Sequence, residues 1–271
     1  MASPISIDQD TGLEIFTDHT GEKRGLACLQ PTEDHLKVRA GIPTLTQYLD
    51  SQGLSLIPRD KWVEITHPTM GTEFINNQRS CNGCTGWSAA QAEMRMRAAR
   101  GFKFVKLSGA YIYSQINGGR DAGSVITDSQ MQLMRAGTCT EAEFDYPNIY
   151  ASQARNITPL YKSLITVTVS TFDEIGTAIQ MGFFPQFGVT VGGVFERFDS
   201  DGVAGYTRGM ANHSVHGAGM KRATSGKPIV EMPNTWGAQW GPFGNGKCYL
   251  SEPAIAGAGM EGYVHIDGND P

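Results

Sequence analysis

The sequence predicts an α+β protein with two lobes, one helical and one rich in β-strands. Apolar residues recur at helical spacing in the first half of the chain. After Pro159 the pattern changes to runs rich in β-branched residues, which favour strands. The 271 residues are enough for a hydrophobic core that needs no disulfide framework, and no internal repeat is visible. Helices followed by strands along one chain are typical of an α+β architecture.

The clearest helix of the first half begins at Cys84. The apolar residues after it recur at helical spacing, and Gly101 ends the pattern. A second helical pattern covers about residues 126–136, where Gly137 is the stop signal. In the second half we expect a short helix at residues 172–181 and strands at residues 164–169, 187–191, 214–220, 229–232 and 247–250.

The first 56 residues are less regular than the rest. Polar stretches alternate there with short apolar ones, which predicts an irregular arm, although Pro43 favours a short helix at residues 42–50. We interpret residues 1–56 as an N-terminal arm or a short propeptide, and residues 57–271 as the main domain. Within this domain we expect the helical lobe at about residues 57–158, the β lobe at about 159–252 and a C-terminal tail at 253–271.

Charge and hydropathy exclude several classes of function. The formal net charge is −5 and no long Lys/Arg cluster occurs, so no nucleic-acid partner is expected. No apolar run reaches the roughly 18 residues of a membrane span, so no membrane association is expected. The first residues lack the charged and apolar regions of a signal peptide, and the five cysteines are an odd number. Together these features favour a cytoplasmic protein in a reducing compartment.

Cys84 is the first candidate for chemistry. A thiol in the first turn of a helix faces unpaired backbone N–H groups and the positive end of the helix dipole. Both favour the thiolate, which is the nucleophilic form. A single Cys at such a position is more often a small buried hydrophobic residue, so other residues must support the assignment.

A metal or redox site is one alternative. Cys81 and Cys84 have the spacing of a zinc or redox motif, and His213 and His216 offer two imidazoles. However, the 132 residues between Cys81 and His213 are far from zinc-finger spacing. The sequence also lacks the Cys-Gly-Pro-Cys motif of thioredoxin-like proteins. We therefore expect neither a metal nor a cofactor.

Three motifs follow one another along the chain. The first is Gln78-x-x-Cys81-x-x-Cys84, the second is Asn212-His213-Ser214-Val215, and the third and most specific is Asn234-Thr235-Trp236-Gly237-Ala238-Gln239-Trp240-Gly241. In this order they resemble the papain-like cysteine peptidase family. His213 lies 129 residues after Cys84, close to the family interval of about 130.

Further segments are similar to the bacterial and bacteriophage-type branch of that family. They are Cys84-Thr85-Gly86-Trp87, Leu107-Ser108-Gly109-Ala110-Tyr111, Gly123-Ser124, Gly137-Thr138-Cys139 and Tyr146-Pro147. The resemblance spans about residues 57–252. The arm and the tail resemble no family that we can name.

The resemblance implies a papain-like two-lobed fold with the active-site cleft between the lobes. Cys84 would be the nucleophile and His213 the base that forms a thiolate–imidazolium pair with it. Asn234 would orient the imidazole. The side chain of Gln78 and the backbone N–H of Cys84 would donate to the oxyanion.

The resemblance also implies where a polypeptide substrate binds. The peptide would lie along Gly123 and Ser124 and form strand-like hydrogen bonds with their backbone. Trp236 would shield the hydrogen bond between the catalytic His and Asn from water. Trp240 would line the leaving-group side of the cleft.

Three departures from the family pattern stand out. The usual disulfide partner of Cys81 should lie near residues 118–121, where no Cys occurs, so Cys81 is expected to be a free thiol. Pro233 precedes Asn234, which puts the local strand pairing in doubt because Pro donates no N–H. His216 is an extra histidine, for which we expect a packing role or a satisfied polar role.

Two functions from different classes follow. The first is a cysteine peptidase acting on polypeptides. The second is a structural or assembly protein, of a bacteriophage particle for example, that keeps the fold with latent or lost activity and docks a protein partner through residues 1–56. Such a protein would be virion-associated.

Overall fold

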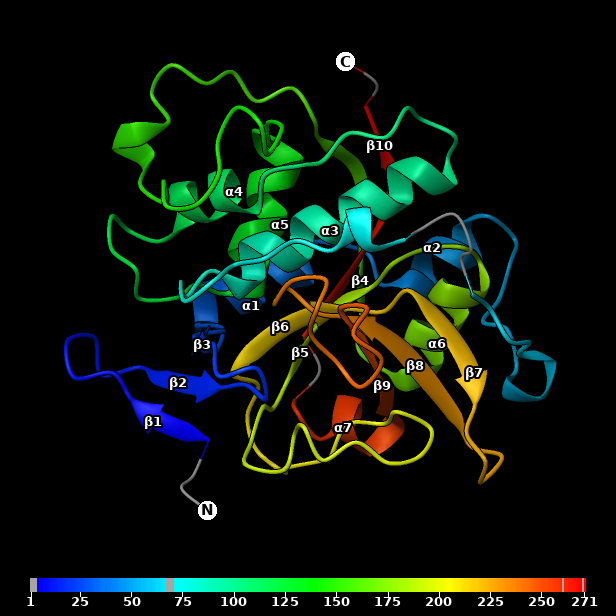
Figure 1. Cartoon of the computed structure of the whole chain (residues 1–271). Helices are drawn as coiled ribbons and strands as arrows, with labels where there is room; N and C mark the ends of the chain where they lie inside the picture. Colours follow the sequence, from blue (N-terminus) through cyan, green and yellow to red (C-terminus); the bar gives the residue numbers. More distant parts are fainter. Residues whose placement is uncertain (1–3, 67–70, 260, 270) are drawn as a thin grey trace.

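A computed structural model describes residues 4–66, 71–259, 261–269 and 271. Helices gather in one lobe and two antiparallel sheets in the other, and Figure 1 shows the helices above the sheets. Residues 1–3 of the arm and residues 260 and 270 of the expected tail lie outside the described residues. The α+β fold class and the two-lobed layout are confirmed.

The helical lobe is built around one buried helix, α3. Its residues are buried from Cys84 to Arg97, and it packs against the next helix of the lobe and against the sheet of the other lobe. Close packing needs glycine here, because a Cβ on Gly86 would lie 2.6 Å from the carbonyl oxygen of Gly109. The helices of this lobe are α3 (Cys84–Ala99), α4 (Gly109–Ile116) and α5 (Ile126–Arg135), with short 3₁₀ turns at Thr72–Phe74 and Ala151–Gln153. The 3₁₀ turn at Arg59–Lys61 lies against the β lobe instead, because Arg59 binds Asp173 and Glu252, so the helical lobe begins later than residue 57.

The β lobe contains two antiparallel sheets. The first has the order β4-β10-β5-β6, formed by β4 (Ser163–Val169), β10 (Gly262–Gly268), β5 (Gln186–Val189) and β6 (His213–His216). The second has the order β7-β8-β9, formed by β7 (Gly219–Arg222), β8 (Pro228–Pro233) and β9 (Lys247–Ser251). Two helices pack on these sheets, α6 (Phe172–Gln180) and α7 (Glu252–Ala256). Much of the largest hydrophobic cluster lies in this lobe.

The expected tail contributes a strand to the β lobe. Strand β10 lies between β4 and β5 in the first sheet, so the lobe extends well beyond residue 252. The single strand expected at residues 214–220 is two strands, β6 and β7, because the chain passes from one sheet to the other at residues 217–218. Pro233 is paired with Lys247 at the end of β8, and the N–H of Asn234 then donates to the carbonyl of Gly246 at 2.9 Å.

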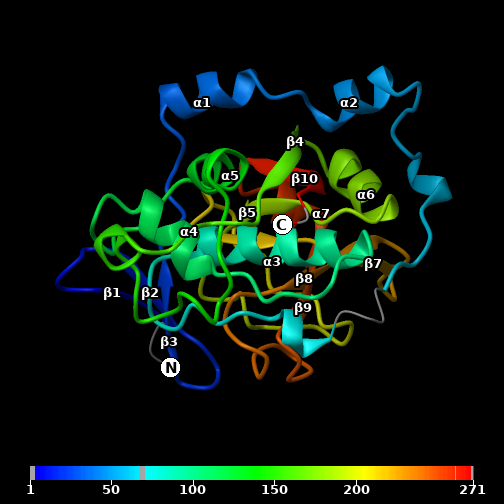
Figure 2. The ribbon, with the colours of Figure 1, turned by 90° about the horizontal axis from the view of Figure 1, so that it is seen from above.

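The arm is more regular than expected. Its first part is a three-stranded sheet of β1 (Ile5–Ile7), β2 (Glu14–Thr17) and β3 (Lys23–Leu26). Two short helices follow, α1 (Glu33–Ala40) and α2 (Leu45–Ser51), and Thr32 and Thr44 cap their N-termini through their side chains. Figure 2 shows α1 and α2 along one side of the molecule, near α5, β4 and α6.

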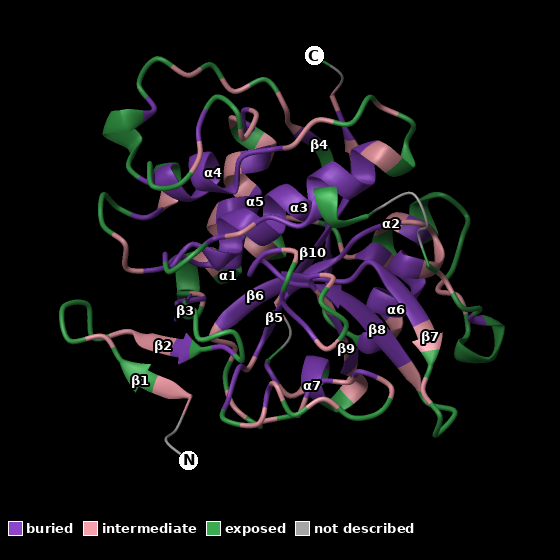
Figure 3. Ribbon diagram, viewed as in Figure 1, coloured by how far each residue is buried: buried purple, intermediate pink, exposed green. Residues whose placement is uncertain are grey.

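The two arm helices differ in burial. No residue of α1 is buried, whereas Leu45 and Leu49 of α2 are 0% exposed and belong to the largest hydrophobic cluster. The N–H of Thr168 in β4 donates to the carbonyl of Pro43 at 2.9 Å, which ties the start of α2 to the sheet. Figure 3 shows that α3 and the sheets of the main domain are largely buried, whereas the loops at the periphery are exposed. Among the described residues no helix is long and apolar enough to cross a membrane.

Candidate active site

Cys84 lies at the point where the two lobes meet. It is the first residue of α3, and Gly83 before it provides no side-chain cap, so the first N–H groups of the helix are free for another acceptor. Its thiol is 0% exposed and faces the backbone N–H groups of Thr85, of Ser214 in β6 and of Ala27 in the arm. The nucleophile candidate is therefore covered by the arm.

His213 and Asn234 form the pair that the sequence predicted. The Nε2 atom of His213 lies 2.8 Å from the Oδ1 atom of Asn234, and both side chains are 0% exposed. Because an amide oxygen only accepts, Nε2 carries the proton and Nδ1 keeps its lone pair. No group among the described residues binds Nδ1, which leaves it available to accept a proton. His213 begins β6, and the adjacent residue Ser214 faces the Cys84 thiol.

Burial keeps both groups neutral in this closed arrangement. It raises the pKa of the Cys84 thiol to about 12, against the lowering effect of the backbone N–H groups of Ser214 and Ala27. It lowers the pKa of His213 to about 4, although the hydrogen bond with Asn234 acts in the opposite direction. A thiolate–imidazolium pair is therefore not the stable form while the arm is in place.

Gln78 is held where it can reach the same region. Its Nε2 donates to the carbonyl oxygen of Cys81 at 2.8 Å and to that of Gly25 in the arm at 3.2 Å. Its Oε1 accepts from the hydroxyl of Thr235, next to Asn234. A carbonyl oxygen of the arm thus occupies a donor that the sequence assigned to the oxyanion.

Gly123 and Ser124 bind an extended segment, and that segment comes from the arm. The N–H of Ser124 donates to the carbonyl of Ala27 at 3.1 Å, and the N–H of Leu29 donates to the carbonyl of Ser124 at 3.0 Å. Cys28 therefore pairs with Ser124 in the parallel direction. The side chain of Ser124 is fixed from behind, since its Oγ lies 2.5 Å from the Oγ1 of Thr85 in α3.

The approach of the arm is close on both sides of Cys84. A Cβ on Gly25 would lie 2.4 Å from the Oδ1 of Asn82 and 2.7 Å from the carbonyl oxygen of Cys81. A Cβ on Gly123 would lie 2.3 Å from the carbonyl oxygen of Ala27. Glycine at these two positions lets the backbone of the arm lie directly on the backbone of the cleft.

Trp236 and Trp240 cover the other end of the site. The ring of Trp236 lies 4.9 Å from that of His213, and Phe16 of the arm stacks on Trp236 at 5.5 Å. Trp240 packs against Trp236 with ring centroids 5.3 Å apart. Both tryptophans line a cavity of about 270 Å³. Its other lining residues are Thr20, Glu22, Arg24, Asn77, Arg79, Gly237, Ala238 and Gln239.

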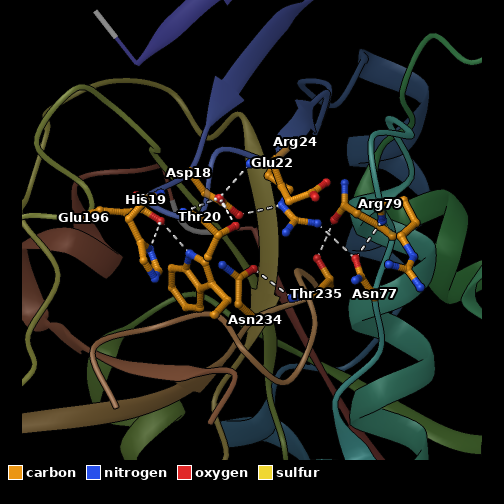
Figure 4. Close-up of polar contacts among 12 residues, drawn as sticks. Asp18, His19, Thr20, Glu22, Arg24, Asn77, Arg79, Glu196, Asn234 and Thr235 are labelled. Atoms are coloured by element: carbon orange, nitrogen blue, oxygen red, sulfur yellow. Dashed lines mark hydrogen bonds and ion pairs between the residues drawn. The ribbon is translucent and has the colours of Figure 1, made fainter. Parts of the chain in front are cut away.

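Two charged side chains hold the arm hairpin at this end (Figure 4). Glu196 accepts from the backbone N–H of His19 at 2.7 Å and lies 3.1 Å from its ring, and it also accepts from the Nε1 of Trp240 at 2.6 Å. Arg24 donates to Asp18 at 2.8 Å and to Asn77 at 3.1 Å. The arm therefore contacts the cleft from the tryptophans to Ser124.

A hydrogen-bonded carboxylate stands where the family disulfide would be. The five cysteines are free thiols. Near Cys81, the backbone N–H of Asn82 donates to Asp121 at 2.8 Å, and the hydroxyl of Tyr113 donates to the same carboxylate oxygen at 2.7 Å. These bonds join the two segments that a disulfide would otherwise join.

The metal hypothesis gains no support. Within the described part of the chain, no group of three or more His, Cys, Asp or Glu side chains could hold a metal ion. His216 is 0% exposed, and burial lowers its pKa well below the ordinary value. Neither ring nitrogen has a hydrogen-bond partner in the described part of the chain, which favours the packing role over the satisfied polar role.

The sequence did not predict which residues fill the cleft. The small residues Gly25, Ala27 and Cys28 interrupt a polar arm, and this pattern could have indicated an extended segment in close contact with other backbone. Their partners, among them Gln78, Cys81 and Ser124, lie far along the chain, and no local pattern identifies them. Asp121 and Glu196 carry no sequence signal of their own.

Comparisons with known proteins support the fold. A scan against models of known families and a search of curated proteins find no match. Among solved structures, the chain is similar to the proform of the ragweed pollen cysteine protease Amb a 11, with 21% identity, a TM-score of 0.64 and coverage of 91% of this chain and 77% of that one. It is also similar to xylellain, a cysteine protease from Xylella fastidiosa, with 17% identity, a TM-score of 0.59 and coverage of 88% and 90%.

Bromelain from Ananas comosus, solved with the E64 inhibitor, is 17% identical with a TM-score of 0.59, and 71% of this chain and 93% of that chain are covered. In other matches, to a second Amb a 11 proform structure and to Cwp84 of Clostridium difficile, the chain spans between 55% and 61% of the matched length. Together with the two lobes that meet at Cys84, these similarities show that the chain has the papain-like cysteine protease fold.

Proposed function

We propose that this protein is a cysteine peptidase of the papain type whose active site is closed by its own N-terminal arm. The observation that carries the proposal is the hydrogen bond of 2.8 Å between His213 and Asn234, which leaves the Nδ1 lone pair of His213 free at the lobe interface where Cys84 lies. A fixed tautomer with a free lone pair is what a thiol needs from its general base. Asn234 supplies the third, orienting member.

The proposed reaction begins when a peptide replaces the arm. His213 takes the proton of Cys84, and the thiolate attacks the carbonyl carbon of the scissile bond. The amide of Gln78, released from Gly25, donates to the developing oxyanion together with the backbone N–H of Cys84. The protonated His213 then gives its proton to the leaving amine, and water hydrolyses the acyl-enzyme.

In this proposal the arm acts as a propeptide. It binds the backbone of Ser124, lies against Gly123, and occupies the Gln78 amide and the face of Trp236, all of which a substrate would need. Its backbone runs parallel to Ser124. The N–H of Ala27 faces the thiol of Cys84, so the arm covers the nucleophile.

The test is hydrolysis of a fluorogenic peptide after the arm has been removed. A recognition sequence for a specific protease is inserted between Gly41 and Ile42, where the chain leaves α1, and residues 1–41 are separated after the cut. We expect hydrolysis by the cut chain, loss of hydrolysis in Cys84→Ala and in His213→Ala, and retention in Cys139→Ala. Hydrolysis that survives Cys84→Ala would contradict the proposal.

A second function is favoured by one observation, namely that Cys84 is 0% exposed in a cleft already filled by the arm. This second function is that of a structural or assembly protein, of a bacteriophage particle for example, in which the arm is a permanent part of the fold. In that case a folded chain without residues 1–41 would hydrolyse no peptide.

A further inference from the structure

A buried glutamine connects the two lobes directly behind the candidate nucleophile and base. Gln186 is the first residue of β5 and is 0% exposed. Its Nε2 donates to the carbonyl oxygen of Thr85 at 2.9 Å, and Thr85 follows Cys84 in α3. The same nitrogen lies 2.9 Å from the hydroxyl oxygen of Ser214, which follows His213 in β6. One amide therefore contacts the helix of the nucleophile and the strand of the base.

A row of buried side chains continues from this amide. The Oε1 of Gln186 accepts from the Nε2 of Gln130 in α5. The Oε1 of Gln130 lies 2.7 Å from the Nε2 of His265 in β10. The Nδ1 of His265 lies 2.6 Å from the carboxylate of Glu93, back in α3. Each of these contacts joins one lobe to the other, and we call Gln186, Gln130, His265 and Glu93 the interlobe network.

The hydrogen bonds of the network run in one direction. A carbonyl oxygen accepts and never donates, so the NH2 group of Gln186 points at Thr85 and its oxygen points at Gln130. Gln130 then turns its own oxygen toward His265, whose Nε2 must carry a proton. Turning either amide over would place two acceptors against each other. The interlobe network thus holds the side chain of Gln186 in one orientation.

Burial makes the placement of the two lobes depend on these bonds. The four side chains are at most 1% exposed, and a buried polar group that loses its partner costs free energy. The hydrogen bonds are therefore satisfied at one relative position of α3 and β6, which pack against each other. The backbone N–H of Ser214 faces the Cys84 thiol, so a shift of β6 would displace this donor and the adjacent His213 together.

We propose that Gln186 is a positioning residue of the peptidase, which sets the distance between the Cys84 thiol and the Nδ1 of His213. The other members of the interlobe network hold its amide in the orientation that this role requires. None of the four belongs to the arm, so the network acts in the closed chain and in the cut chain. The inference rests on the proposed peptidase function, but its first test does not.

The first test uses the intact chain and needs no catalysis. The direction of the hydrogen bonds requires a proton on the Nε2 of His265, which nitrogen NMR of histidine-labelled protein detects. The signals of His265 are assigned by their loss in His265→Gln. We expect a protonated Nε2 at neutral pH. An unprotonated Nε2 would overturn the proposal, because Gln186 would then point its oxygen at the carbonyl of Thr85.

The second test uses the chain cut between Gly41 and Ile42. Gln186→Met keeps the length of the side chain but can neither donate to Thr85 nor accept from Gln130. We expect kcat for a fluorogenic peptide to fall about ten- to hundredfold while KM stays nearly unchanged, because the reacting atoms are misplaced. The alkylation of Cys84 by iodoacetamide should also require a higher pH, since a displaced base takes the thiol proton less readily.

Two further variants separate positioning from stability. Gln132→Met in α5 removes a hydrogen bond to the carbonyl of Gly137, and it should leave kcat and the alkylation profile unchanged. Ser214→Ala removes the hydroxyl beside Gln186 and should lower kcat by about two- to fivefold. It replaces Gln186→Met in the comparison where that variant does not fold. A residue that only stabilised the fold would change the Tm without shifting the alkylation profile of the folded chain.

The outcomes separate the two claims. If the wild-type cut chain hydrolyses no peptide, the peptidase proposal fails and the positioning role fails with it. If the wild-type cut chain is active and the folded variant at Gln186 or Ser214 has the same kcat and the same alkylation profile, Gln186 is not a positioning residue and the peptidase proposal stands.

Discussion

The first 56 residues contain two helices that are held to the protein in different ways. The cleft segment, residues 24–29, binds through backbone hydrogen bonds, glycine contacts and the buried side chain of Leu26, whereas α1 after it has no buried residue. Helix α2 is held by Leu45 and Leu49, which are 0% exposed in the main hydrophobic cluster. We therefore infer that the boundary between a releasable arm and the folded domain lies after the exposed α1, at about residue 41.

The largest expected effect concerns the segment that stays. Leu49→Ala removes a buried side chain and should lower the free energy of unfolding by about 2–5 kcal/mol. Leu36→Ala in α1 is the matched control, because Leu36 is 51% exposed, and its effect should be below about 0.5 kcal/mol. Urea unfolding measures both. Equal losses would contradict the distinction between the two segments.

The next effect concerns the cleft segment. Gly25→Leu places a side chain against Asn82 and Cys81. We expect this clash to destabilise the closed arrangement by about 1–3 kcal/mol. An epoxide inactivator should then label Cys84 about tenfold faster or more. Lys23→Leu changes an exposed residue of the same strand and should leave the rate unchanged. A Gly25→Leu chain that labels as slowly as the wild type would mean that the arm does not limit access.

Protonation provides a third distinction. In the closed chain burial raises the pKa of Cys84 to about 12, so the thiolate is scarce at neutral pH and alkylation by iodoacetamide should rise only in the alkaline range. Once the arm is removed, water and the His213 lone pair reach the thiol, and the alkylation rate should level off at a lower pH. Identical pH profiles for the two forms would refute this account of latency.

The smallest expected effect is at the hairpin. Glu196→Gln keeps the size of the side chain but removes the charge that binds His19 and Trp240. We expect the epoxide inactivator to label Cys84 about two- to fivefold faster, in keeping with weaker hydrogen bonds from His19 and Trp240 at a partly exposed site. Glu22→Gln, on the same side of the cleft but without these contacts, should have no effect. If Glu196→Gln increased the labelling rate of Cys84 more than Gly25→Leu does, the hairpin rather than the cleft segment would be the main contact that holds the arm on the cleft.

Much of the fold could be predicted from the sequence because its signals are local. The helix from Cys84 ends just before Gly101, and the strands of the β lobe follow β-branched runs, as expected. The pairing of His213 with Asn234 was predictable only from the order of the motifs. The hydrogen bond of 2.8 Å between these side chains requires that the start of β6 lie near the end of β8. The sequence does not predict that these two strands are neighbours.

The arm could not be predicted in this way. Its residues pair with Ser124, Gln78 and Glu196, which lie far along the chain, and the small side chains of Gly25 and Ala27 show only that something lies close. Strand β10 was missed because the polar residues around it carry a weak pattern, although the sheet buries most of the strand. In both cases tertiary contacts, rather than local preference, determine the structure.

The most direct test of the account is covalent labelling of Cys84 by an epoxide inactivator, measured by mass spectrometry on the intact chain and on the chain without residues 1–41. The account predicts that Cys84 is labelled slowly in the intact chain and rapidly after removal of the arm, and that His213→Ala abolishes the gain. A Cys84 that remains unlabelled in a folded chain without its arm would contradict it.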